Sequence, residues 1–221
     1  SNTSSALSIT IDATAPSAPS SLTTAATTTS DNTPIITGIA EAGSTVKLYN
    51  GSTLLGSATA DSNDAFSITS STLSDGNYSL TATATDSTGN TSNTSSALSI
   101  TIDTTAPSAP SALSTNTTKT SDTTPIIKGT AEAGSTVKLY NGSTLLGSAT
   151  ADSNDAFSIT SSTLSDGNYS LTATATDSAG NTSNTSSSLS ITIDDSVTLK
   201  KQIISASELL SLDEQYTGIV N

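Results

Sequence analysis

The stretch that decides the fold reads SDGNYSLTATAT and runs from Ser74 to Thr85. It starts with a turn of Ser, Asp, Gly and Asn, after which apolar and polar side chains alternate. That two-residue period is typical of a β-strand with one buried face. Tyr78 opens the strand directly after the turn, where β-sandwich domains place a tyrosine whose hydroxyl binds the backbone, a tyrosine corner. The alternative is a tyrosine that only packs in the core.

The same stretch returns 91 residues later, from Ser165 to Thr176. Residues 1–91 and 92–182 align without gaps and match at 81 of 91 positions, with an unbroken match from Ala40 to Ser87. A period this long indicates tandem whole domains. We therefore expect the last strand of a preceding repeat at 1–12, a first domain at 13–103, a second at 104–194 and the start of a different module at 195–221.

Each copy divides into short alternating runs separated by turn residues every 8–12 positions, which predicts an all-β sandwich or barrel. In the first copy the expected strands are 19–28, 34–40, 45–49, 54–60, 65–69, 78–85 and 97–102. Seven strands in about 91 residues fit an immunoglobulin-like sandwich, in which Leu80 stands where antibody domains carry a cysteine. The predicted fold is all-β: tandem immunoglobulin-like β-sandwich domains of about seven strands each, followed by a short non-repeat segment.

The alternation also assigns the faces of the strands. The core candidates are Val46, Leu48, Phe66, Ile68, Tyr78, Leu80, Ala82, Ala84, Leu98, Ile100 and Ile102. On the strand at 34–40 the two copies decide the face, because Thr37 corresponds to Lys128 and Ile39 to Thr130, so that face should meet water. The opposite face, which we expect to be buried, holds Ile36, Gly38 and Ala40.

Charge and composition exclude several functions. Nineteen acidic residues against six lysines and no arginine give a net charge of −13. That balance argues against binding nucleic acid or an anionic membrane surface. No apolar run approaches the roughly 20 residues of a membrane span. With neither histidine nor cysteine, the commonest general base and the thiol nucleophile are missing, so we expect no enzyme. A carboxylate pair is the formal alternative, but the acids recur at domain ends.

The acidic residues lie outside the expected strand interiors. Following the chain direction through the sandwich, Glu41, Asp61, Asp64 and Asp86 gather at one end. Asp31 and Asp75 gather at the other end, where Asp103 leaves for the next copy. Crowded carboxylates repel one another unless a cation lies among them, and Ca²⁺ accepts six to eight oxygens from irregular loops. This placement predicts Ca²⁺ at the junctions between domains.

The predicted calcium ligands are Asp12, Glu41 and Asp86 at the first junction and Asp103, Glu132 and Asp177 at the second. Weaker candidates are Asp31, Asp61, Asp64, Asp75, Asp152 and Asp155, with the amides of Asn90 and Asn181. The alternative is that aspartate simply favours turns and keeps an acidic protein soluble. The spacing of these residues matches no compact calcium motif such as an EF-hand.

Several motifs together resemble a known family. They are EAGSTV at 41–46, LGSATAD at 55–61, DGNY at 75–78, ATD at 84–86 with GN at 89–90, and IDTTAP at 102–107. In this order they resemble the bacterial Ig-like repeats of giant biofilm-associated, type I-secreted surface adhesins, over residues 1–194. The resemblance implies a secreted stalk of many sandwiches at the bacterial cell surface, stiffened by linker Ca²⁺, and it favours Asp103, Glu132 and Asp177. Asp194-Asp195-Ser196-Val197 departs from the linker pattern.

The predicted function is a structural stalk segment of an extracellular adhesin that supports cell adhesion or biofilm formation, with neighbouring repeats as its partners. One alternative is a module that binds carbohydrate or protein, although each repeat offers only Tyr49, Phe66 and Tyr78 as aromatic residues. Another is a filament subunit that binds other copies by strand addition through residues 1–12, rather than leaving them frayed. Ser205 to Glu208 has capping-box form and predicts a short helix.

Overall fold

The computed structural model of the chain describes residues 5, 7, 9 and 11–196. It divides into two compact units, Ser1–Thr105 and Ala106–Asn221. The helix expected after Ser205 lies outside the described residues.

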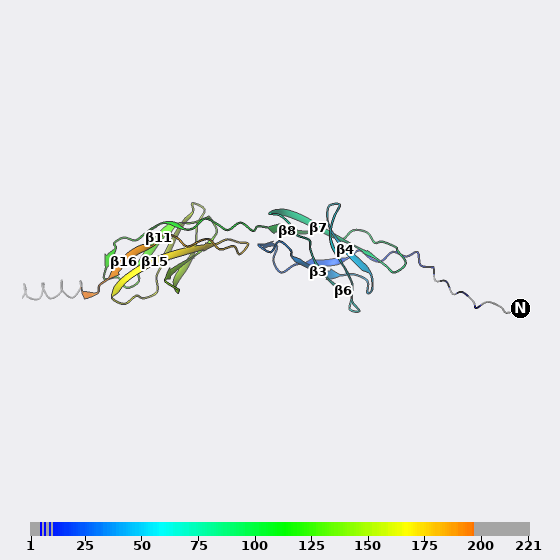
Figure 1. Ribbon diagram of the computed structural model, residues 1–221, viewed down its shortest axis with the longest axis horizontal. Helices are drawn as coiled ribbons and strands as arrows, with labels where there is room; N and C mark the ends of the chain where they lie inside the picture. Colours follow the sequence, from blue (N-terminus) through cyan, green and yellow to red (C-terminus); the bar gives the residue numbers. More distant parts are fainter. Residues whose placement is uncertain (1–4, 6, 8, 10, 197–221) are drawn as a thin grey trace, which may run out of the picture. The chain divides into compact units, whose positions relative to one another are not determined.

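The first unit is a sandwich of two sheets. Its strands are β1 (Ser20–Thr23), β2 (Thr28–Thr29), β3 (Ile35–Ile39), β4 (Thr45–Asn50), β5 (Thr53–Thr59), β6 (Ala65–Thr69), β7 (Gly76–Thr85) and β8 (Leu98–Ile102). One sheet has the order β1-β3-β6 and the other β2-β8-β7-β4-β5. Figure 1 shows β3 and β6 on one side of this unit and β7 and β8 on the other. The predicted all-β immunoglobulin-like sandwich is confirmed.

The second unit repeats this arrangement strand by strand. Its strands are β9 (Ser111–Ser114), β10 (Lys119–Thr120), β11 (Ile126–Thr130), β12 (Thr136–Asn141), β13 (Thr144–Thr150), β14 (Ala156–Thr160), β15 (Gly167–Thr176) and β16 (Leu189–Ile193). The sheets have the orders β14-β11-β9 and β10-β16-β15-β12-β13. The second copy therefore keeps the topology of the first at every strand.

The first strand of each copy differs from the prediction. The sequence predicts one strand over 19–28, whereas the structure has two short strands in different sheets. β1 pairs antiparallel with β3, and β2 pairs parallel with β8. The register of β1 shifts between Ser20 and Thr23, and Ser21 has a φ of 55°. The chain thus crosses from one sheet to the other within the predicted strand. The weak alternation of apolar and polar residues in this segment does not favour either sheet.

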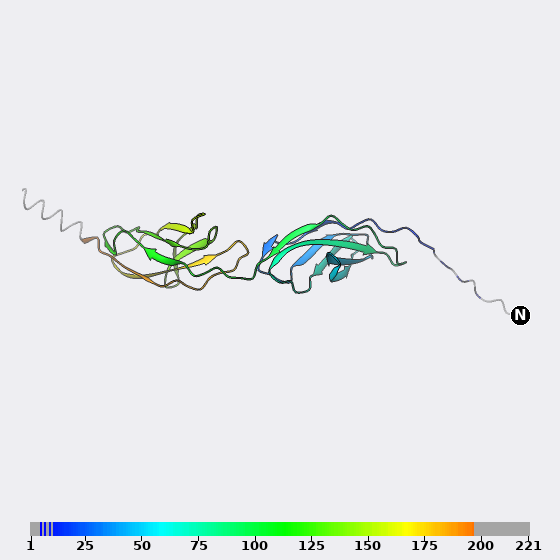
Figure 2. The ribbon, with the colours of Figure 1, turned by 90° about the horizontal axis from the view of Figure 1, so that it is seen from above.

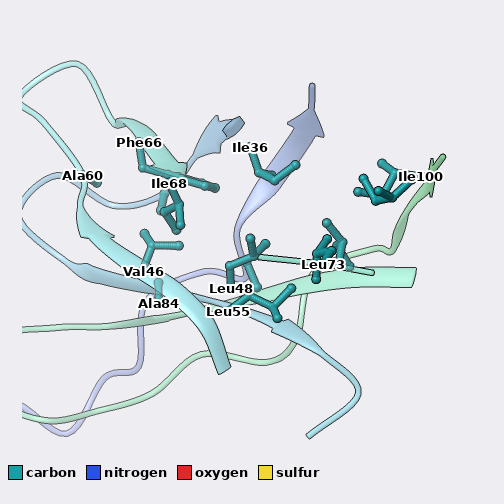
Figure 3. Close-up of a cluster of buried hydrophobic side chains, with 14 residues drawn as sticks. Ile36, Val46, Leu48, Leu55, Ala60, Phe66, Ile68, Leu73, Ala84 and Ile100 are labelled. Carbon is teal, nitrogen blue, oxygen red and sulfur yellow. The ribbon is translucent and has the colours of Figure 1, made fainter. Parts of the chain in front are cut away.

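The hydrophobic core of the first unit lies between its two sheets. Figure 3 shows Ile36, Phe66 and Ile68 pointing toward Val46 and Leu48 of the opposite sheet. The predicted inward hydrophobic side chains are confirmed as buried or packed against this cluster, whereas Ile39 is 49% exposed. Gly38, also predicted to face inward, is half-buried and lies against the ring of Phe66. Leu55 and Leu73 are also buried. Strand alternation gives no signal for Leu73, because this residue lies in the loop before β7.

The tyrosine corner is present in both units. The hydroxyl of Tyr78 donates a hydrogen bond to the carbonyl oxygen of Ser74 at 2.8 Å, and Tyr169 does the same to Ser165 at 2.8 Å. Two residues further along β7, Leu80 is fully buried. The tyrosine therefore ties the turn that precedes the long central strand to that strand, beyond packing its ring against the core.

Residues before the first sandwich belong to no strand in the part that the structure describes. Leu7, Ile9 and Ile11 are 83%, 70% and 88% exposed. The counterparts of Ile9 and Ile11 in the repeat, Ile100 and Ile102, are 2% and 1% exposed within β8. The same short sequence is therefore core in the sandwich and solvent-exposed before it.

Candidate functional site

The acidic loops at the two ends of each sandwich are the candidate site. The loop that follows β7 folds around the carboxylate of Asp86. One oxygen of this carboxylate accepts the backbone N–H of Thr88 and of Asn90, each at 2.9 Å, and the Thr88 hydroxyl at 2.9 Å. The other oxygen accepts the side-chain amide of Asn90 at 2.8 Å. The Asn90 side chain is the largest of the causes that lower the pKa of Asp86 to about 2.

The chain segment that enters the first sandwich is held by this same loop. The Asn90 amide donates to the main-chain oxygen of Asp12 at 3.0 Å, and the Thr88 hydroxyl donates to it at 3.4 Å. The Asp12 carboxylate accepts the N–H of Thr14 at 2.9 Å. The incoming segment is therefore fixed beside the C-terminal end of β7, by contacts that join residues more than 70 positions apart.

The segment that leaves the first sandwich is held at the opposite end of β7. Asp75 directly precedes that strand, and one of its carboxylate oxygens accepts both the N–H and the hydroxyl of Thr104, at 2.9 and 2.8 Å. The other oxygen accepts the Thr105 hydroxyl at 2.8 Å. These bonds, the Thr104 hydroxyl first, lower the pKa of Asp75. The outgoing segment also pairs with the sheet, because the N–H of Asp103 donates to the Thr29 carbonyl at 3.0 Å.

The length of β7 therefore separates the incoming from the outgoing segment. This strand has 10 residues, and at about 3.3 Å per residue it spans about 33 Å. Figure 2 shows it running along the long direction of the first unit. The chain enters the sandwich beyond one end of β7 and leaves it beyond the other.

Two further turns share the end of the sandwich that holds Glu41. The carboxylate of Asp61 accepts the N–H of Asn63 at 2.8 Å and of Ala65 at 2.9 Å, and the Ala65 bond is the largest cause that lowers its pKa. Asp64, which has a φ of 63°, accepts the N–H of Ala42 at 2.9 Å. The turn around Glu41 and the loop around Asp64 are therefore joined directly.

The second unit repeats these loops around Asp177, Asp152 and Asp155. The Asp177 carboxylate accepts the N–H of Ala179 at 2.8 Å and of Asn181 at 2.9 Å, and the Asn181 amide donates to its other oxygen at 2.8 Å. Burial acts to raise the pKa of Asp177, but the hydrogen bonds outweigh it and the pKa is lowered. Asp152 accepts the N–H of Asn154 at 2.8 Å and of Ala156 at 3.0 Å, and Asp155 accepts that of Ala133 at 3.0 Å.

The outgoing end of the second unit differs from that of the first. The Asp166 carboxylate accepts the N–H of Asp195 at 3.0 Å. Lys119 forms an ion pair with Asp194 at 3.1 Å, and the Ser196 hydroxyl also donates to Asp194. These two contacts, the Ser196 bond first, lower the pKa of Asp194.

The predicted calcium ligands lie in end loops, where the aspartate carboxylates among them accept hydrogen bonds from backbone and side-chain donors. Asp31 accepts the N–H of Thr33 at 2.9 Å, and Asp103 accepts that of Thr105 at 3.0 Å. The Glu132 carbonyl accepts the N–H of Ser135 at 3.0 Å. Over residues 5, 7, 9 and 11–196 no group of three acidic side chains lies close enough to hold a metal ion. Calcium binding therefore stays a prediction.

The threonines at these ends and the donor role of the asparagine side chains were not predicted from the sequence. Thr88, Thr104 and Thr105 supply hydroxyl donors, and Asn90 donates through its side-chain NH₂ group. The order Asp86-Ser87-Thr88 could have predicted the bond to the Thr88 N–H, because an aspartate side chain commonly accepts the N–H of the residue two positions later. No local signal joins Asp75 to Thr104, which lies 29 residues away.

Comparison with known proteins agrees with this fold. The sequence profile of the bacterial Ig-like domain matches residues 5–104 and again 106–195. The chain belongs to the bacterial Ig-like domain family. This match confirms the family resemblance and the tandem arrangement. No curated protein matches the chain significantly.

Among solved structures, the bacterial Ig-like chain is similar to the fibronectin(III)-like modules of Clostridium thermocellum CbhA. The identity is 20% and the TM-score 0.51, over 79% of this chain and 94% of that one. A biofilm-associated protein BSP domain matches with 25% identity and a TM-score of 0.32, over 79% of this chain and 30% of that one. The D0-D1 domain of intimin matches with 16% identity and a TM-score of 0.29, over 79% and 98%. The described residues include no helix long and apolar enough to cross a membrane.

Proposed function

We propose that this bacterial Ig-like chain is a spacer segment of an extracellular cell-surface adhesin, which supports adhesion or biofilm formation by holding a binding region away from the cell. The observation that carries the proposal is the position of the two connecting segments. Asn90 holds the incoming chain beyond one end of β7, and Asp75 holds the outgoing chain beyond the other. In a domain connected in this way, the points where the chain enters and leaves are separated by about the length of the domain. Each tandem copy would add a similar separation.

The side chains at the ends support a structural role rather than catalysis. The carboxylates of Asp61, Asp75 and Asp86 accept hydrogen bonds from their own loops and linkers, and their pKa values are lowered. A general acid or base instead needs a pKa near the working pH. Sugar recognition by aromatic stacking has little support, because Phe66 is buried and the Tyr78 hydroxyl is bound to Ser74. We therefore propose a non-enzymatic module.

Small-angle scattering on chains with two, three and four tandem copies of residues 104–194 tests the spacer. The largest dimension should grow by an equal increment of about 33 Å or more for each added copy, because each β7 equivalent spans that length. Growth that falls off with each copy, as in a compact globule, contradicts the proposal. Binding of the same chains on a glycan array would support a ligand-binding module instead.

A finer part of the proposal is that Ca²⁺ stiffens the chain near Asp12, Glu41 and Asp86, and near Asp103, Glu132 and Asp177. It is supported by the net charge of −13 and by the gathering of acids in end loops. Carboxylate, amide and backbone oxygens of irregular loops are the ligands that Ca²⁺ accepts. Binding would require some of these carboxylates to exchange backbone donors for the ion.

Isothermal titration of the chain with CaCl₂, beside MgCl₂ as the matched control, tests the calcium part. Binding heat and a rise in melting temperature with millimolar Ca²⁺ only, both weakened by Asp86→Ala, are expected. Equal responses to the two ions, or none, would exclude a specific calcium site and leave the spacer proposal standing.

A second candidate, assembly by strand addition, is favoured by the exposed side chains of Leu7, Ile9 and Ile11. Extended apolar segments can add to the edge of a sheet in another chain. Sedimentation of the chain from 1 to 200 μM tests it. Concentration-dependent oligomers that disappear in an Ile9→Asp variant would support assembly, whereas a monomer throughout would contradict it.

A further inference from the structure

We propose that each domain carries a hydrogen-bond clamp on its outgoing linker, whose strength is set by the two residues after the Ile-Asp that ends the last strand. In the first domain the clamp consists of Asp75, Thr104 and Thr105. The clamp would fix the direction in which the chain leaves the domain, so its role in the protein rests on the proposed spacer function. It requires no metal ion.

The sheet holds the backbone of the outgoing chain only as far as Asp103. Ile102 is the last residue of β8 and pairs with Gly76, and the N–H of Asp103 donates to Thr29. Beyond that point the N–H and hydroxyl of Thr104 and the hydroxyl of Thr105 donate to the Asp75 carboxylate. The clamp therefore extends the fixed part of the chain by two residues beyond the sheet.

The carboxylate of Asp75 is itself held in place by its neighbours. Ser74, on one side, has its carbonyl bound by the Tyr78 hydroxyl at 2.8 Å. Gly76, on the other side, is the first residue of β7 and pairs with Ile102 of β8. The turn between them is thus confined from both sides, so the tyrosine corner serves as the anchor of the clamp as well as a feature of the core.

Two oxygens of one carboxylate accept three donors, and two of these donors are threonine hydroxyls. The number of hydroxyls therefore decides how many bonds the clamp can form. The positions that correspond to Thr104 and Thr105 are occupied by Ala13 and Thr14 before the first domain and by Asp195 and Ser196 after the second. The chain thus contains three different versions of this linker.

The second domain shows the weakened version. Asp166 corresponds to Asp75, and it accepts the N–H of Asp195 at 3.0 Å. The residue at position 195 brings a carboxylate in place of the donor hydroxyl, and Ser196 donates to Asp194 instead. Among the described residues, the side chains at positions 195 and 196 therefore form none of the bonds to Asp166 that the hydroxyls of Thr104 and Thr105 form to Asp75. The two linker residues therefore set how many hydrogen bonds hold the segment that leaves each domain.

Amide hydrogen exchange of the full chain, followed by NMR in EDTA, tests the clamp. The N–H of Thr104 should be protected in the wild type and should exchange at least about tenfold faster in Asp75→Ala, because a broken side-chain bond opens the segment locally. Asp31→Ala is the matched control, since Asp31 lies in another loop and binds Thr33, and it should leave the Thr104 exchange rate unchanged. Protected amides of β7 report that each variant remains folded.

A gain-of-function variant completes the test. Asp195→Thr together with Ser196→Thr rebuilds the threonine pair beside Asp166, and it should slow exchange of the N–H at position 195 by a similar factor. Unchanged exchange at Thr104 in Asp75→Ala, or unchanged exchange at 195 in the double variant, overturns the clamp. Failure of the spacer shows separately, as scattering dimensions that do not grow evenly, whatever the exchange rates.

Discussion

The ring of Phe66 lies directly against the backbone of Gly38 on the neighbouring strand. A β-carbon at position 38 would be 2.7 Å from Cζ of Phe66 and 2.9 Å from the carbonyl oxygen of Ser20. Gly38→Ala should therefore lower the free energy of unfolding of the first unit by about 1–3 kcal/mol, the usual cost of overpacking. Urea denaturation measures it. Ile39→Thr, which copies Thr130 of the second repeat, is the control and should change stability by less than about 0.5 kcal/mol.

Removal of the Tyr78 hydroxyl tests the tyrosine corner. Tyr78→Phe should lower the free energy of unfolding of the first unit by about 1 kcal/mol, because the carbonyl of Ser74 loses its hydroxyl donor while the ring still packs. Tyr49→Phe removes a hydroxyl from a half-buried tyrosine of β4 and serves as the control. Equal losses from the two substitutions in urea denaturation would contradict a special role for Tyr78.

The depressed pKa of Asp86 predicts a specific dependence of stability on pH. The pKa is about 2 in the folded protein against an ordinary value of 3.8. The contribution of Asp86 is complete above pH 3.8 and declines as the pH falls toward 2, because the unfolded chain takes up the proton first.

The difference in melting temperature between wild type and Asp86→Asn should therefore be largest at neutral pH and shrink between pH 4 and pH 2. Thermal denaturation followed by circular dichroism over this range measures it. A difference that grows as the pH falls would show that the Asp86 carboxylate is not stabilised in the folded state.

Each unit should unfold independently, because each has its own hydrophobic core. Leu80 and Leu171 occupy equivalent, fully buried positions in two separate hydrophobic clusters. Leu80→Ala should destabilise the first unit by about 2–5 kcal/mol through lost burial and the cavity left behind. Urea titration followed by NMR signals of each unit should show the midpoint of the second unit unchanged, and Leu171→Ala should give the mirror result. Joint shifts of both midpoints would contradict independent units.

Local sequence patterns predicted most of the fold, because strand alternation and turn formation depend on residues that are close together in the sequence. The alternation in β7, the turn before Tyr78 and the copy differences at Thr37 and Ile39 each assigned a strand, a corner or a face that the structure confirms. The strand expected over 19–28 was wrong where it divides between two sheets. The side chains of this segment alternate too weakly between apolar and polar to predict which sheet it joins.

By itself the sequence determined that this chain is a pair of acidic sandwiches with their carboxylates in loops at the domain ends. Only the tertiary structure decided which partners those carboxylates take. The bonds from Asn90 to Asp12 and from Thr104 to Asp75 join positions 78 and 29 residues apart. Such contacts exist only once the β-strands have brought distant loops together, and no short-range pattern in the sequence records which donor will then lie nearest to each carboxylate.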